Sequence, residues 1–175
     1  IGSSEDIAFS LTILAQVDLE HDQPMRALKR LERALPELQV NDPEGLRPVA
    51  HALLAHALAQ QGELAQATEV LRNFPIDEEA WPHIKVRGEL ARGLAWRHIG
   101  NHRNSAAAMM AARDIAEKAA YRYYLFVAHN ELSLVDETPD ARAAHQRKAK
   151  SLGRSIAANL PRIEAKTFLT HRLHS

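Results

Sequence analysis

Histidine is frequent in this sequence, with ten among 175 residues, and its imidazole can bind a metal or transfer a proton near neutral pH. A metal site needs several ligands that converge, two of them commonly at helical spacing. His98 and His102 are four residues apart, but Gly100 between them predicts a turn, so the two rings are not expected to share a helix face. The sequence contains no HExxH motif. It therefore predicts no metal site.

The residue patterns of other common catalytic sites are also missing. The chain has no Cys, which excludes a thiolate zinc site and a Cys nucleophile. Neither GxxxxGK[ST] nor GxGxxG occurs, so no phosphate-binding loop is predicted. The acidic runs at 77–79 and 136–137 stand just before expected helices, where negative charge complements the helix dipole. We therefore expect a protein that is not an enzyme and that has no cofactor.

Composition predicts an all-helical protein. Ala and Leu, which favour helices, are the two commonest residues, whereas the strand-favouring Val, Ile and aromatic residues are few. No apolar run reaches the roughly 18 residues of a membrane helix. Lys plus Arg and Asp plus Glu both number 22, and this balance argues against nucleic acid as a partner. A Cys-free, charge-balanced chain of this length fits a single domain over 1–175 and a cytoplasmic location.

Prolines and capping residues divide the chain into nine expected helices. Asp42-Pro43 and Thr138-Pro139 each pair a capping residue with a proline suited to the first helical turn. Pro36 falls inside the second expected helix and should end or kink it. The expected helices are about 5–21, 24–39, 44–61, 63–73, 79–99, 102–119, 121–135, 139–159 and 161–172.

Four expected turns stand at nearly equal intervals. They centre on Asp22, Gly62, Gly100 and Thr138, at spacings of 40, 38 and 38 residues. Small residues recur at three fixed offsets from these turns in the first three units, while the fourth unit fits only in its middle. The residues at the three offsets are Ala15, Ala27 and Ala34, then Ala55, Ala67 and Phe74, then Gly93, Ser105 and Ala112, and finally Glu131, Ala143 and Lys150. This regularity indicates one helix–turn–helix unit repeated along the chain.

Over about residues 8–155 this pattern resembles the tetratricopeptide repeat. That family has a period of about 34 residues, small residues where its two antiparallel helices cross, and often a turn glycine, to which Gly62 and Gly100 correspond. The longer units here are similar to the divergent helical repeats of bacterial regulatory and signalling proteins. The resemblance implies a right-handed α-solenoid of about four antiparallel hairpins with a C-terminal capping helix. The units would span about 5–40, 44–75, 79–119 and 121–159, and the cap 161–173.

The resemblance also implies where a partner would bind. In this family the first helix of each unit lines a concave groove that binds extended or helical peptides. Arg87, Arg97 and His98 would form a positive centre for a carboxylate or phosphate. The alternative is that the arginines only pair with neighbouring carboxylates such as Glu89 and Glu78. The expected groove residues are Gln16, Glu20, His56, Gln60, Arg87, Leu94, Arg97, His98 and His129.

The function implied by the resemblance is a non-enzymatic protein–protein interaction or regulatory module. It would belong to a larger bacterial signalling or transcription-regulatory protein and bind an acidic or C-terminal peptide segment. A small-molecule effector sensor is one alternative, which a buried polar pocket near Arg97 would favour.

The uneven charge of the chain leaves another alternative open, a homo-oligomerisation scaffold such as a homodimer. Residues 1–99 carry a net charge of −5 and residues 100–175 a net charge of +5. Opposite charges on the two halves would allow one copy to associate with another. The basic helix over 139–159 is expected instead to be a solvated outer face.

Overall fold

The computed structural model describes residues 4–42, 45–76 and 80–172, and over these residues it is all-helical, without a strand. This confirms the predicted all-α class. The helices expected to begin at 44 and 79 begin at Arg47 and Pro82, and 44 and 79 themselves lie outside the described residues. The helices are α1 (Ser4–Glu20), α2 (Pro24–Val40), α3 (Arg47–Gln60), α4 (Leu64–Asn73), α5 (Pro82–Ile99), α6 (His102–Lys118), α7 (Arg122–Val135), α8 (Pro139–Ala157) and α9 (Arg162–Arg172).

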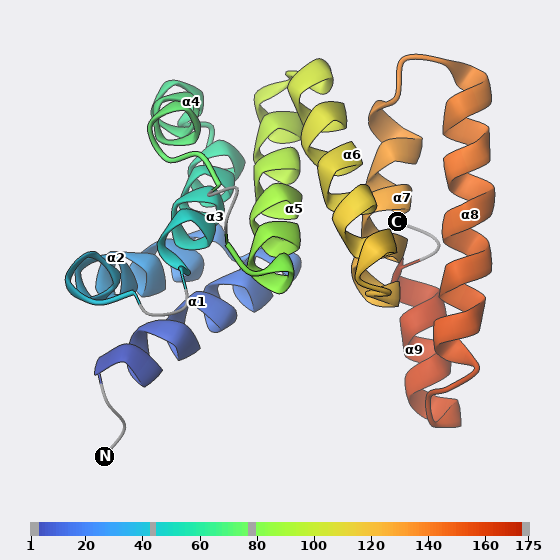
Figure 1. Ribbon diagram of the computed structural model, residues 1–175, viewed down its shortest axis with the longest axis horizontal. Helices are drawn as coiled ribbons and strands as arrows, with labels where there is room; N and C mark the ends of the chain where they lie inside the picture. The colour runs from blue at the N-terminus through green and yellow to red at the C-terminus, as the bar shows by residue number, and fades with distance from the viewer. Residues whose placement is uncertain (1–3, 43–44, 77–79, 173–175) are drawn as a thin grey trace.

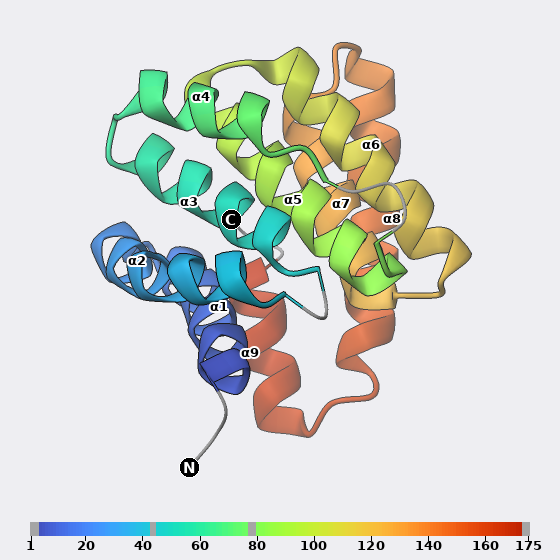
Figure 2. The ribbon, with the colours of Figure 1, turned by 60° about the vertical axis from the view of Figure 1, so that its left-hand side comes forward.

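The helices lie in three groups along the long axis of the molecule (Figure 1). Helices α1 to α4 lie at one end, α5 and α6 in the middle, and α7 to α9 at the other end. Each helix packs on the next, and α3 also packs on α1 and α5, while α5 packs on α7. Figure 2 shows α3 between α1 and α5. The four helices α1, α3, α5 and α7 therefore form one continuous row. Among the described residues, none of the helices is long and apolar enough to cross a bilayer.

Three of the predicted turns share one backbone geometry. Asp22, Gly62 and Gly100 have φ angles of 56°, 84° and 85°, the left-handed conformation that commonly ends a helix. In each turn the next residue donates its N–H to the carbonyl five residues earlier. These pairs are Gln23 to Asp18 at 2.8 Å, Glu63 to Leu58 at 2.9 Å and Asn101 to Trp96 at 2.9 Å. Thr138 differs, because its φ is −103° and its hydroxyl caps α8 by accepting the Ala141 N–H at 3.2 Å.

Small side chains fill the places where neighbouring helices meet. The small residues predicted for the first three units are buried, Phe74 excepted, which is 37 % exposed. Between α5 and α6, the Ser105 hydroxyl donates to the Gly93 carbonyl at 2.8 Å. A Cβ on Gly93 would lie 2.6 Å from Cε of Met109, so only glycine fits without displacing that side chain. Ala143 is exposed on α8, so the fourth predicted unit does not bury its small residue.

Two helix ends differ from the expectations. Helix α2 continues through Pro36 to Val40, so Pro36 does not end it. Because Pro36 lies four residues before the last residue of α2, its missing N–H removes a single hydrogen bond near the end of the helix. Helix α3 begins at Arg47 with Leu46 as its N-cap residue, so Asp42 is not the N-cap that the sequence predicted. Its carboxylate still accepts the N–H groups of Leu46 and Arg47 at 2.6 and 2.8 Å, just before the helix.

We predict that Ala67→Leu lowers the free energy of unfolding by about 1–3 kcal/mol, because Ala67 is fully buried and a larger side chain overpacks its site. The measurement is urea unfolding followed by circular dichroism. Ala65→Leu on the exposed face of the same helix is the matched control and should change stability by less than about 0.5 kcal/mol. Equal stability of the two variants would contradict the packing described here.

Candidate functional site

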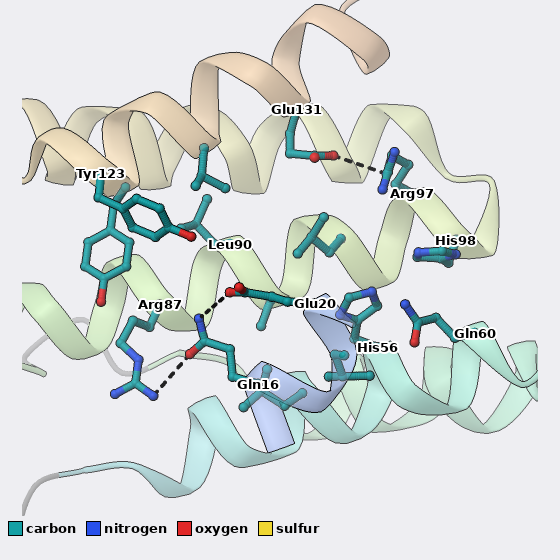
Figure 3. Close-up of a pocket in the computed structure, with 16 residues that line it drawn as sticks. Gln16, Glu20, His56, Gln60, Arg87, Leu90, Arg97, His98, Tyr123 and Glu131 are labelled. Carbon is teal, nitrogen blue, oxygen red and sulfur yellow. Dashed lines mark hydrogen bonds and ion pairs between the residues drawn. The ribbon is translucent and has the colours of Figure 1, made fainter. Parts of the chain in front are cut away.

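A cavity of about 210 Å³ opens on the row formed by α1, α3, α5 and α7 (Figure 3). Its walls carry apolar and polar side chains from all four helices, and the charged ones come from α1, α5 and α7. The structure brings together every predicted groove residue except His129. The predicted residues that line the cavity are Gln16, Glu20, His56, Gln60, Arg87, Leu94, Arg97 and His98.

Polar contacts join α5 to α1 at one side of the cavity. Arg87, only 8 % exposed, donates from Nη2 to Oε1 of Gln16 at 3.3 Å. Gln16 in turn donates from Nε2 to Oε1 of Glu20 at 3.4 Å. Figure 3 shows this chain of hydrogen bonds along the cavity wall. The Arg87 charge is therefore linked through a neutral amide to a carboxylate on α1.

An ion pair joins α5 to α7 on the opposite wall. Nε of Arg97 lies 3.2 Å from Oε2 of Glu131, and both side chains are largely buried. Of the two carboxylates expected beside the arginines, Glu89 pairs instead with Arg92 at 3.9 Å. The other, at residue 78, lies outside the described residues. With Glu20 and Glu131 facing the two arginines, the cavity has no excess of positive charge, unlike the centre that the sequence predicted.

The inner corner of the cavity is formed by His56 and Gln60, one helical turn apart on α3. His56 is 4 % exposed, and its ring lies 5.1 Å from that of His98, centre to centre. Burial, and then the proximity of His98 and Arg97, lowers the pKa of His56 from 6.5 to about 3, so the ring is neutral at pH 7. Among the described residues, neither His56 Nε2 nor Gln60 Oε1 has a hydrogen-bond partner, although both atoms are buried.

His98 lies on the more exposed side of this corner. Partial burial lowers the pKa of His98, and the Arg97 charge lowers it further, while Asp22 acts in the opposite direction. The sequence placed His98 in a positive centre, but an imidazole with a lowered pKa carries less charge at neutral pH.

Apolar side chains separate the two polar ends of the cavity. Leu53 and Leu90 are nearly fully buried beneath it, and Leu94 is half-buried. In Figure 3 the His56 corner lies toward one end, Arg87 and Tyr123 toward the other, and Leu90 between them. The cavity therefore offers hydrogen-bonding ends and an apolar middle, an arrangement common in ligand sites.

His129 does not line the cavity, contrary to the sequence prediction. Its Nδ1 lies 2.8 Å from Nδ1 of His145 on α8, and Nε2 of His145 lies 3.5 Å from Asp136. Burial, followed by the charges of His145, Arg113 and Lys148, lowers the pKa of His129 to about 4. Among the described residues, no three His, Cys, Asp or Glu side chains are grouped in a way that could hold a metal ion.

Sequence analysis missed the residues that α7 contributes to the cavity, namely Tyr123, Tyr124, Val127 and Glu131. An offset of six residues before the turn identifies Gln16, His56 and Leu94 on the first three helices of the row. The same offset from Thr138 gives Leu132, which is fully buried, whereas the adjacent Glu131 faces the cavity. Counting from Glu137 instead would have identified Glu131.

Comparison of the chain with protein-family models, curated proteins and solved structures finds no match.

We predict that acid weakens the fold partly through His56. Between pH 6.5 and about 3 the unfolded chain binds a proton at His56 that the folded chain does not bind. Stability is then highest above pH 6.5 and falls as the pH decreases, by up to about 1.4 kcal/mol per pH unit for one proton. Urea unfolding at several pH values should give a flatter dependence for His56→Phe than for the wild type. The same slope in both proteins would contradict a neutral buried His56.

Proposed function

We propose that this chain is a non-enzymatic binding module built as a tetratricopeptide-repeat-like, right-handed α-solenoid. The successive helix pairs α1–α2, α3–α4, α5–α6 and α7–α8 would be its hairpins and α9 its cap. Support comes from the contacts within these pairs, from the contacts between successive odd-numbered helices, and from the shared geometry of three turns. Helix α9 also contacts the preceding helices, since the ring of Phe168 lies 5.4 Å from that of Phe126.

The observation that carries the proposal is the cavity shared by α1, α3, α5 and α7. In a solenoid of hairpins, the first helix of each unit faces the concave side, and these four helices are the first helices of the proposed units. Residues far apart in sequence, such as Gln16 and Arg87, meet there through direct hydrogen bonds. The lining suits recognition, because it combines paired charges, neutral hydrogen-bonding groups and an apolar floor.

The partner that we favour is a peptide or protein segment with an acidic or C-terminal carboxylate. Arg87 and Arg97 are the cations of the cavity, and a guanidinium can bind a carboxylate through two parallel hydrogen bonds. Their present contacts, with Gln16 and Glu131, would then be exchanged in part for contacts with the partner. By the family resemblance, the module would be a cytoplasmic part of a larger bacterial signalling or transcription-regulatory protein.

A small-molecule effector sensor is the second candidate. The buried polar corner beside Arg97 favours it, since His56 and Gln60 hold buried atoms without a partner among the described residues. A cavity of about 210 Å³ corresponds to about seven water molecules at roughly 30 Å³ each, which is small for a long peptide but sufficient for a compact ligand. The homo-oligomerisation alternative rests on the opposite charges of the two halves of the chain, and light scattering tests it directly.

We predict that a display library of random C-terminal peptides yields acidic binders, and that Arg97→Glu weakens their binding at least about tenfold. Arg97→Glu also places a second carboxylate against that of Glu131, which destabilises the fold. The double variant that exchanges the two residues, Arg97→Glu with Glu131→Arg, restores the ion pair. The swap should recover the melting temperature but not the affinity, which isothermal titration calorimetry measures.

Arg103→Glu on the exposed surface of α6 makes the same change of net charge and serves as the control. It should leave peptide affinity unchanged. Full affinity in the swapped variant, or a library without any binder, would contradict peptide binding at this cavity.

A further inference from the structure

The inner corner of the cavity contains buried hydrogen-bonding atoms that the described part of the chain leaves without a partner. These atoms are Nε2 of His56 and Oε1 of Gln60, on the same face of α3 and one turn apart. Leaving a buried polar atom unpaired costs free energy, so such atoms are commonly satisfied by water or by a ligand. Both side chains line the cavity, and because neither of the two atoms is itself exposed, an incoming group would reach them by a turn of the side chains.

The corner favours an uncharged group. His56 is held neutral by its burial and by the nearby positive groups, so it offers a hydrogen bond and no charge. A cation entering here would approach the guanidinium of Arg97, which acts on His56. An anion would meet the unpaired oxygen of Gln60. The Gln60 oxygen accepts a hydrogen bond and therefore requires a donor, which a carboxylate cannot supply.

A carboxamide meets these requirements with two separate atoms. Its NH₂ can donate to Gln60 Oε1, and its oxygen can accept from Nε2 of His56 in the tautomer that carries its proton there. A hydroxyl would have to serve both partners through a single oxygen. The apolar floor beside the corner, with Leu53, Leu90 and Leu94, suits an aliphatic stem that carries the amide.

We propose that this corner is a subsite for an uncharged carboxamide group carried on a short apolar stem. The inference rests on the binding role proposed above for the cavity and names the chemistry that its inner end selects. The carboxamide can belong to a free small molecule or to a glutamine or asparagine side chain of a peptide.

The test uses the full chain and four probes of one shape: 4-methylpentanamide, 4-methylpentanoate, methyl 4-methylpentanoate and 4-methylpentan-1-ol. Titration at pH 7, followed by the NMR signal of the His56 Cε1–H group, should show saturable binding of the amide. The other three probes should bind at least about tenfold more weakly. No shift with the amide, or equal binding of the carboxylate, would overturn the proposal.

Variants identify the two atoms. His56→Phe and Gln60→Met keep the approximate shape of each side chain and remove the unpaired atom. For the variants, calorimetry replaces the His56 signal, and the amide should bind at least about tenfold more weakly to each. Their melting temperatures should hold or rise, because each change removes an unsatisfied buried group. Gln61→Met, on an exposed residue just after α3, is the matched control and should bind the amide like the wild type. Amide binding within about twofold of wild type in both cavity variants would overturn the proposal.

Capped peptides distinguish the two sources of the amide. Binding of acetyl-Ala-Gln-Ala-N-methylamide that is tighter than binding of 4-methylpentanamide, and tighter than that of the Glu analogue with the same caps, assigns the group to a peptide side chain. Binding of the free amide alone assigns it to a small molecule. Either result supports the subsite.

The same experiments distinguish a failure of the carboxamide subsite from a failure of the proposed peptide binding. If acidic peptides bind through Arg97 but the amide does not bind, only the subsite is wrong. If the amide binds and the library yields no peptide, the subsite stands and the peptide-binding role is wrong.

Discussion

The close approach of helix backbones is the constraint on which the rest of this structure depends. Alanine, glycine and serine occupy the meeting points of the helices, and the hydrogen bond from Ser105 to the Gly93 carbonyl shows how near α6 lies to the backbone of α5. Ala side chains bury little area each, so the core forms because inner helices such as α3 and α5 are covered by several neighbours. Helix α5 contributes to all three apolar clusters of the core, through Ile84 and Ala91, Val86 and Leu90, and Ala95 and Trp96.

The central position of α5 explains the electrostatics of the cavity. A helix covered on most sides can carry long charged residues only where neighbouring helices supply partners. Arg87 has Gln16 on α1, and Arg97 has Glu131 on α7, so α5 is linked by polar contacts to both sides of the row. The same enclosure removes water from His56 and holds its imidazole neutral. Packing and electrostatics are therefore two consequences of one arrangement.

The helices and half of the residues that line the cavity could be predicted from the sequence because both depend on local signals. Asp22, Gly62 and Gly100 end their helices through a left-handed residue, and offsets counted from such a residue carry the helix register accurately. No left-handed residue marks the end of α7 before Thr138. An offset of six residues counted from Thr138 therefore leads to Leu132, one residue past the one that faces the cavity. A shift of one residue rotates a helix by about 100°, which is enough to exchange the buried Leu132 for the cavity-facing Glu131.

The pairing of Arg97 with Glu131 and the lowered pKa of His56 depend on contacts between distant segments, and no spacing in the sequence encodes them.

The position of the cavity also determines what an occupant would do to the chain. Its walls come from four helices, and in an array that is stabilised by contacts between neighbours, a group touching all four acts as an additional contact across them. Binding to the folded form alone stabilises it by about 2.7 kcal/mol at a ligand concentration of 100 times Kd. Because α5 participates in every part of the core, this stabilisation is not confined to one end of the row but extends from α1 to α7. An occupant would therefore fix the relative positions of the two halves of the chain.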